Sequence, residues 1–166
     1  MKKPSKIKSI TGKVMPGLMG KRFAAITLFG VVYTKKQATA DVINSTDGLD
    51  SVLETHEMIH VKQAVSTRNS WFLFYMHYIF EWLYNLPLIF VNGYAPYKFM
   101  PLEIEAYRNE YNTDHALQEK CEDWRKYRKL GIRTRFELAK MWYSSKSKYS
   151  YNFMKFISSE IDHLIE

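Results

Sequence analysis

The sequence predicts a mostly α-helical α+β fold, in which a small N-terminal β-sheet precedes a series of helices. Three observations lead to this prediction. Residues 23–34 are rich in aromatic and β-branched side chains, whereas apolar residues recur at helical spacing from residue 50 onward. Neither a repeat nor a low-complexity linker divides the 166 residues, of which 46% are hydrophobic. We therefore expect a basic N-terminal segment at residues 1–22 and a single domain at residues 23–166.

The N-terminal sheet is expected to come from two segments. Residues 23–34 fit one strand, and residues 38–43 fit a short second strand. Residues 44–48 combine Asn, Ser, Asp and Gly, so they should form a loop that ends the sheet region.

Two long helices are expected next. The first covers residues 50–67, with Asp47 and Asp50 as helix-start residues. The second covers residues 71–91 and carries a single formal charge, Glu81. By length alone this second segment is long enough to span a bilayer.

The polar residues of the second helix argue against a membrane span. His77, Glu81, Asn85 and Pro87 interrupt its apolar character. Opposite His77, Glu81 and Tyr84 runs an apolar stripe made of Phe72, Tyr75, Met76, Ile79, Leu83, Leu86 and Phe90. We therefore expect a buried or partly buried helix, on which His77 and Glu81 share a polar face because they are four residues apart.

The C-terminal half is expected to contain four further helices. Pro101 can open the first of them, and Gly131 stops the second. The expected elements are a loop at residues 92–100, helices at 101–121, 124–130, 135–143 and 151–165, and a serine- and lysine-rich connection at 144–150. One side of the last helix is apolar, as in core packing or a dimer face.

Residues 56–60 read H-E-M-I-H inside the first long helix. Histidines four positions apart lie on one helix face, so His56 and His60 can bind one zinc ion while Glu57 acts as the general base. A chance match to H-E-x-x-H in this chain is on the order of one in a hundred. The alternative is a solvated or core histidine pair, but the spacing favours a metal site.

A catalytic zinc site needs a third protein ligand and an open coordination position. The helix that Pro101 opens holds two acids in its first turn, Glu103 and Glu105. These acids lie about 200° apart around the helix, and Glu103 shares a face with Ala106, whose small side chain would let two helices approach closely. Glu103 is therefore the preferred ligand, and Glu105 is better explained as an ordinary helix-start charge.

The H-E-x-x-H helix, the aromatic helix and the E-x-E-A segment, in this order, resemble the gluzincin group of zinc metallopeptidases. The resemblance is closest to a group of small uncharacterised bacterial zincin-like proteins, and it covers roughly residues 23–114. Their pattern is H-E-x-x-H-x-x-Q, then an aromatic stretch with a glutamate, then F-E-x-E-A-Y. The matching residues are His56, Glu57, His60, Gln63, Glu81, Leu102, Glu103, Glu105, Ala106 and Tyr107.

The resemblance implies a zincin-like active-site helix packed on a small N-terminal sheet. It also implies that His56, His60 and Glu103 bind Zn2+ and that Glu57 is the general base. Larger relatives commonly continue E-x-x-A with an aspartate where this chain has Tyr107, so a carboxylate that would orient a ligand histidine is not supplied there.

Peptide hydrolysis is the reaction class that such a site suggests. Zinc activates water and polarises a carbonyl group, and a nearby carboxylate accepts the proton. A second oxyanion donor would complete the site, and the candidates are His77, Tyr107, Arg108 and His115. Each of these four also has an ordinary structural explanation.

Charge and cysteine content narrow the partners and the compartment. The formal charge of +7 comes mainly from basic runs near the two ends of the chain. Basic runs of this kind are mostly solvated, and no nucleic-acid motif accompanies them, so we expect no nucleic-acid partner. The predicted metallopeptidase site makes a peptide or protein the expected substrate. The single cysteine, Cys121, fits a reducing compartment, and the first twenty residues lack the apolar core of a signal peptide. A cytoplasmic protein is expected.

Two other classes of function stay open. A binding or structural protein could retain zinc in a closed site, with a fourth ligand from Glu105, His77 or His115. A membrane-surface protein could instead use the aromatic helix at residues 71–91 together with the basic ends, without crossing the bilayer.

Overall fold

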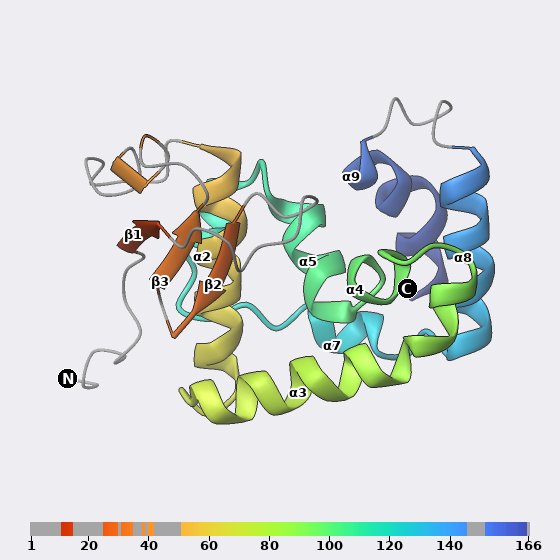
Figure 1. Ribbon diagram of the computed structural model, residues 1–166, viewed down its shortest axis with the longest axis horizontal. Coiled ribbons are helices and arrows are strands. Elements are labelled where there is room, and N and C mark those ends of the chain that lie inside the picture. Colours follow the sequence, from red (N-terminus) through yellow and green to blue (C-terminus); the bar gives the residue numbers. More distant parts are fainter. Residues whose placement is uncertain are drawn as a thin grey trace. The chain divides into compact units, whose positions relative to one another are not determined.

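The computed structural model describes residues 11–14, 25–29, 31–34, 38, 40–41, 51–145 and 152–165. Most of these residues are helical, which confirms the coarse fold class (Figure 1). The chain divides into two compact units. Unit 1 comprises Met1–Trp71 with Asn109–Cys121, and unit 2 comprises Phe72–Arg108 with Glu122–Glu166.

Unit 1 contains a small sheet. Its strands are β1 (Thr11–Val14), β2 (Ala25–Leu28) and β3 (Val31–Thr34), in the order β1-β3-β2. β1 is parallel to β3, and β2 is antiparallel to it, with Leu28 opposite Val31. The chain reverses direction between β2 and β3, where Phe29 has a φ of 53°.

Both strand predictions for this region were wrong in detail. Residues 23–34 do not form one strand, because the chain reverses at Phe29, next to the turn-favouring Gly30 of the sequence. The expected strand at residues 38–43 is also wrong, since its described residues, Ala38, Ala40 and Asp41, are helical. Alanine is the best helix former, which explains this outcome. The loop expected at 44–48 lies outside the described residues.

The predicted H-E-x-x-H helix is confirmed as α2 (Val52–Ser66), and Ser51 is its N-cap. The Ser51 hydroxyl accepts a hydrogen bond from the Glu54 backbone N–H at 3.1 Å and donates one to the Glu54 carboxylate at 2.9 Å. This S-x-x-E arrangement satisfies a backbone donor of the first turn. The expected start residues, Asp47 and Asp50, lie outside the described residues.

α2 is buried along almost its whole length. β2 and α6 (Thr113–Ala116) pack against it, and the Cys121 backbone N–H donates to the Lys62 carbonyl at 3.3 Å. Burial extends to the charged and polar side chains of α2, including Glu54 and Glu57. Buried charges are costly unless they bind partners or metals, so these side chains are candidates for function.

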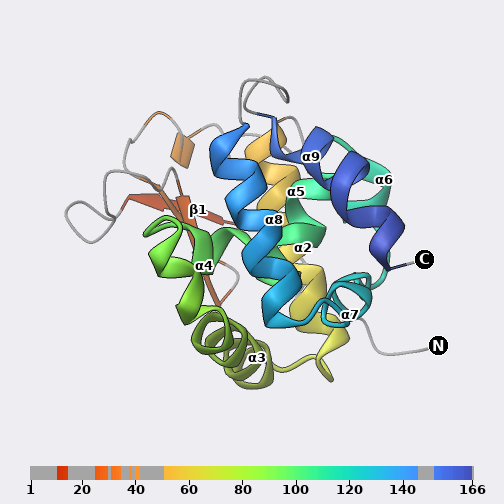
Figure 2. The same cartoon turned by 90° about the vertical axis from the view of Figure 1, so that its right-hand side faces the viewer.

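Unit 2 is built from short and medium helices around one apolar core. Its elements are α3 (Trp71–Tyr84, with Trp71 in unit 1), η1 (Leu86–Phe90), α4 (Ala95–Lys98), α5 (Pro101–Asn109, with Asn109 in unit 1), α7 (Trp124–Tyr127), α8 (Ile132–Ser144), α9 (Phe153–Phe156), the π-helical η3 (Ile157–Ile161) and η4 (Asp162–Leu164). α8 and α9 lie side by side (Figure 2). Trp142 of α8 meets Phe153 and Phe156 of α9 with ring centroids 5.0 and 5.4 Å apart.

The helix predicted at residues 101–121 was wrong because it is interrupted. α5 ends at Asn109, and a new cap starts α6, where the Asn112 carboxamide accepts a hydrogen bond from the His115 backbone N–H at 3.1 Å. An asparagine that caps a new helix competes with continuation of the old one. Gly131 does more than stop the preceding pattern, because it is the N-cap of α8.

Of the other predictions for unit 2, one helix is confirmed and the remaining segments differ in part from what was expected. α8 confirms the helix expected at residues 135–143. The loop expected at 92–100 contains α4, and the helix expected at 124–130 is helical only over α7. The segment expected as one helix at 151–165 is α-helical over α9 and then continues as π- and 3₁₀-helix. Residues 146–150 of the expected connection lie outside the described residues.

α3 is partly buried, as expected, and its apolar stripe is the more exposed of its two sides. Its apolar stripe faces outward, and Phe72 and Ile79 keep 71% and 51% of their surface exposed. The opposite side, with Phe74 and Glu81, is buried. The expectation of a buried or partly buried helix therefore holds for the polar side of α3, whereas much of its apolar stripe stays exposed. Among the described residues, no helix combines the length and the apolar character needed to cross a membrane.

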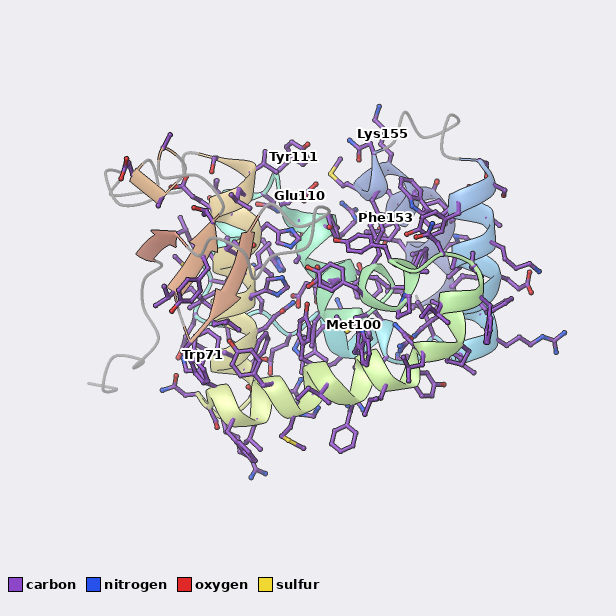
Figure 3. The ribbon with its side chains drawn as sticks, in the orientation of Figure 1. Trp71, Met100, Glu110, Tyr111, Phe153 and Lys155 are labelled. Atoms are coloured by element: carbon purple, nitrogen blue, oxygen red, sulfur yellow. The ribbon has the colours of Figure 1, made fainter. Side chains whose placement is uncertain are left out.

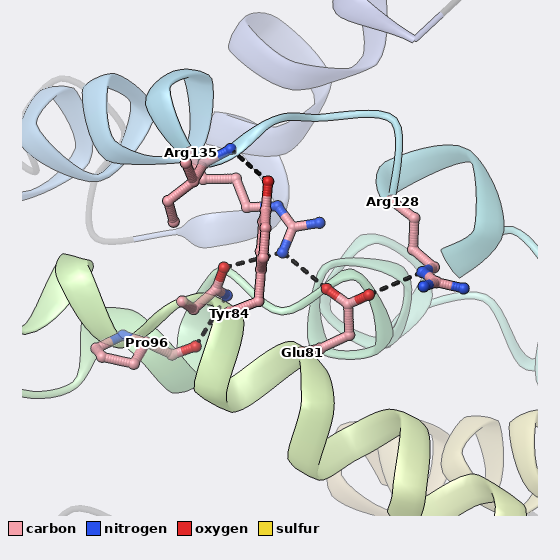
Figure 4. A network of polar contacts seen from close by, with 7 residues as sticks. Glu81, Tyr84, Pro96, Arg128 and Arg135 are labelled. Atoms are coloured by element: carbon pink, nitrogen blue, oxygen red, sulfur yellow. Dashed lines mark hydrogen bonds and ion pairs between the residues drawn. The ribbon is translucent and has the colours of Figure 1, made fainter.

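An ion-pair network explains why the polar side of α3 faces inward (Figure 4). The Glu81 carboxylate accepts hydrogen bonds at 2.8 Å from Arg128 Nε and from the buried guanidinium of Arg135. Arg135 also donates to the Asn85 side chain, which in turn donates to the Pro96 carbonyl at 3.0 Å. These bonds compensate the buried charges, so the polar side is fixed and the apolar side is left outward.

Breaking this network should destabilise unit 2. Glu81→Ala leaves the Arg135 guanidinium buried without its carboxylate, so we expect a loss of about 3 kcal/mol or more in the free energy of unfolding. Arg128→Ala is the matched control, because half of the Arg128 side chain is exposed and such a pair contributes less than about 1 kcal/mol. Urea unfolding measures both, and equal losses in the two variants would contradict the assignment.

Candidate metal site

The H-E-x-x-H residues occupy one turn of α2 in unit 1. The imidazole rings of His56 and His60 lie with centroids 5.0 Å apart and an interplanar angle of 77°. Their side chains and that of Glu57 are all buried, with residue exposures of 8%, 6% and 6%. The four-residue spacing therefore places both rings next to each other in an enclosed environment, as the sequence predicted.

Each ring is oriented through the same nitrogen atom. His56 Nδ1 lies 3.3 Å from a carboxylate oxygen of Glu110, and His60 Nδ1 lies 2.8 Å from the carbonyl oxygen of the Gln63 side chain. An oxygen acceptor at Nδ1 favours the tautomer with hydrogen on Nδ1 and the lone pair on Nε2. Metal-binding histidines are commonly held in this way, so both Nε2 atoms are prepared as ligands.

Glu110 is a residue that the sequence reasoning missed (Figure 3). The Glu110 carboxylate, which is largely buried, takes the orienting role that was sought at position 107. Glu110 is seven residues after Glu103, and on a continuous helix this spacing would bring both acids to one face. This seven-residue spacing is the sequence feature that could have indicated Glu110 as a further residue of the site. Gln63, in contrast, was among the predicted neighbours of the site and contacts His60 directly.

The two candidate acids of α5 have different environments within unit 2. Glu103 is fully buried, and one of its oxygens accepts a hydrogen bond from the Tyr78 hydroxyl at 2.5 Å. Both oxygens of Glu105 accept backbone N–H groups at the start of α7, from Asp123 at 3.0 Å and from Trp124 at 3.2 Å. Glu105 therefore has a structural role at a helix start, although the helix is α7 and not its own.

Tyrosines surround Glu103, and the sequence reasoning did not single them out. Tyr97 lies against Tyr78 and Tyr94, with ring centroids 6.4 and 5.0 Å away. Burial raises the pKa of the Tyr94 hydroxyl to about 12. Burial and then the charge of Glu103 raise the pKa of Tyr97 well above its usual range. These phenols therefore stay protonated at neutral pH and serve as hydrogen-bond donors.

The two candidate site residues on α3, His77 and Glu81, contact other residues of unit 2. The His77 ring lies against Trp124, with centroids 5.3 Å apart. Burial and then the charges of Arg128 and Arg125 lower the pKa of His77, which keeps the imidazole neutral at neutral pH. Glu81 binds two arginines, as described above. Glu81 thus has the satisfied polar partners that the sequence left open as an alternative, whereas the described contact of His77 is with an aromatic ring.

The proposed oxyanion donors downstream also have structural partners. The Tyr107 ring packs against Phe153 and lies under the Lys98 ammonium group, whose nitrogen is 4.1 Å from the ring centroid. Arg108 Nε binds Asp162 at 2.7 Å. His115 belongs to unit 1, where its backbone carbonyl accepts a hydrogen bond from the Cys121 thiol at 3.4 Å.

Comparison of the chain with protein-family models, with curated proteins and with solved structures gives no match. The chemistry that this site could support therefore follows from its own residues. In unit 1 these are the oriented histidines and the buried Glu57, and in unit 2 they are Glu103 and the tyrosines around it.

Proposed function

We propose that the chain is a zinc-dependent hydrolase, and specifically a metallopeptidase, with His56, His60 and Glu103 as zinc ligands. The observation that carries the proposal is the matched orientation of the two histidines, each of which directs Nδ1 to an oxygen acceptor. Two imidazoles and a carboxylate are a ligand set that suits a metal ion, and it is the set of many catalytic zinc sites. Zinc content of the purified chain and of its ligand variants tests the proposal.

We also propose that unit 1 has a zincin-like fold. A zincin-like arrangement requires an active-site helix beside a small sheet. Unit 1 supports this with the contact between α2 and β2. The order of the motifs along the chain adds to the support, because Glu103 follows the H-E-x-x-H helix as in the gluzincins.

Each residue of the site has a distinct task in this proposal. Bound zinc would supply Lewis acidity, which polarises a substrate carbonyl and acidifies water. Glu57, next to His56, accepts the proton of the attacking water at a carboxylate oxygen and passes it to the leaving amine. Tyr78 donates to Glu103 and so fixes the orientation of this carboxylate. The buried surroundings of α2 exclude bulk water from these proton transfers.

An open coordination position distinguishes an enzyme from a protein that only stores or fixes zinc. A closed site needs a fourth ligand, and the sequence candidates were Glu105, His77 and His115. The Glu105 carboxylate binds two backbone N–H groups of α7, and the neutral His77 ring lies against Trp124. These contacts support the catalytic alternative.

Glu110 offers a separate test of the site. Glu110→Ala removes the acceptor at His56 Nδ1, so we expect zinc affinity to fall by about 10- to 100-fold, which is typical for partners of metal-bound histidines. Competition with a chromogenic chelator measures this affinity. Glu119→Ala is the matched control, because Glu119 is an exposed acid in the same segment of unit 1. Identical affinities of the two variants would remove Glu110 from its orienting role.

A further inference from the structure

Unit 2 presents an exposed apolar surface along α3 and η1. We call it the α3–η1 face and define it by Phe72, Ile79, Phe80, Leu83, Ile89 and Phe90. Phe80 and Phe90 keep 61% and 87% of their surface exposed. In Figure 3, side chains project from α3 on the side away from α4. Contiguous exposed apolar surfaces of this kind mark sites of interaction.

The α3–η1 face carries no formal charge. The one charged residue between Phe72 and Val91 is Glu81, and its carboxylate points inward to Arg128 and Arg135. Helices that pack on a globular core usually turn their apolar stripe inward, so the exposed stripe of α3 is suited to contact with an apolar environment outside the chain. Aromatic side chains, which dominate this face, favour the interfacial region of a bilayer.

Exposed cations lie on the segment that packs against the polar side of α3. Arg125, Lys126, Arg128, Lys129 and Arg133 are exposed along α7 and the start of α8. Two bonds join this segment to the C-terminal half of α3, because Arg128 binds Glu81 and the Ile132 backbone N–H donates to the Tyr84 hydroxyl at 3.0 Å. The acids Glu122 and Asp123 pair with Arg125 and Lys126 only as exposed i, i+3 pairs, which are weak.

We propose that the α3–η1 face binds the surface of an anionic lipid bilayer, with its apolar side chains in the interface and the basic segment on the headgroups. A helix with an apolar, charge-free outer side and with cations packed against its polar side complements an apolar bilayer that carries anionic headgroups. A second copy of this chain is a poorer occupant, because the same contact would bring together two chains that each carry a net charge of +7. This inference does not depend on the proposed hydrolase function.

Vesicle sedimentation of the full chain tests the proposal. With vesicles of phosphatidylcholine containing roughly one third phosphatidylglycerol, we expect the unmodified chain to bind more strongly than to pure phosphatidylcholine. The triple variant Ile79→Ser, Phe80→Ser, Phe90→Ser should bind at least about tenfold more weakly, because three large apolar side chains no longer insert. The control variant Tyr111→Ser, Leu117→Ser removes similarly exposed apolar groups from unit 1 and should bind like the unmodified chain.

The charge of the basic segment is tested separately. Arg125→Ser, Lys126→Ser, Lys129→Ser should weaken binding to the anionic vesicles about tenfold or more and leave the weak binding to phosphatidylcholine unchanged. Unaltered sedimentation of the Ile79, Phe80 and Phe90 variant would overturn the proposal. Concentration-dependent dimers that disappear in this variant, without vesicle binding by the unmodified chain, would overturn it in favour of a second copy. Glu57→Gln should bind vesicles like the unmodified chain, because Glu57 is not part of the α3–η1 face. Vesicle binding can therefore be tested independently of peptide hydrolysis.

Discussion

The variants His56→Ala and His60→Ala are expected to lose the stoichiometric zinc of the purified chain. Each removes one of three proposed ligands, so the drop in zinc affinity should exceed the roughly 10- to 100-fold loss typical of an outer partner such as Glu110. Plasma mass spectrometry after dialysis measures the metal content. His163→Ala provides the matched control, since His163 is exposed on η4 and has no part in the proposed site.

The same measurement decides between the two acids of α5. Glu103→Ala should lose zinc as the histidine variants do. Glu105→Ala should keep zinc in its folded fraction but unfold more easily, because the N–H groups of Asp123 and Trp124 lose their acceptor. The reverse result, zinc lost from Glu105→Ala and kept by Glu103→Ala, would replace the proposed ligand. An unmodified chain that holds no zinc would refute the metal site altogether.

Local patterns account for what the sequence predicted correctly. α8 has an amphipathic helical pattern over many residues, and the H-E-x-x-H motif of α2 depends only on spacing within one helix. Even the pairing of His60 with Gln63 is a three-residue relation on one helix. Such features follow from the geometry of a single element, so a sequence can specify them.

Long-range contacts explain the failures. The amphipathic pattern of α3 identifies two sides, but which side faces inward depends on Arg128 and Arg135, which are 47 and 54 residues away from Glu81 in sequence. Glu110 is likewise 54 residues from His56. The end of α5 depends on the competing cap at Asn112. Spacing within one helix does not identify the partners of Glu81 or the cap at Asn112, and the spacing of Glu110 from Glu103 does not reveal that Glu110 contacts His56.

Glu57→Gln is expected to separate metal binding from catalysis. Glutamine has nearly the same shape as glutamate but cannot accept a proton, so zinc should remain stoichiometric while peptide hydrolysis falls by about 10²- to 10⁴-fold. A fluorogenic peptide library, assayed with the zinc-loaded chain, provides the rate. Glu137→Gln is a suitable control, because Glu137 is exposed on α8 and pairs only with Lys140.

The combination of zinc content and rate makes each outcome informative. Retained zinc with an unchanged rate would exclude Glu57 as the general base. Stoichiometric zinc in an unmodified chain that cleaves no member of the library would leave the metal site intact and reject hydrolysis, which favours the non-catalytic zinc protein. Glu57 is buried next to His56 on α2, and a buried carboxylate beside two histidines is a candidate for a functional role. Loss of turnover with retention of zinc would therefore identify proton transfer as the reason for this buried acid.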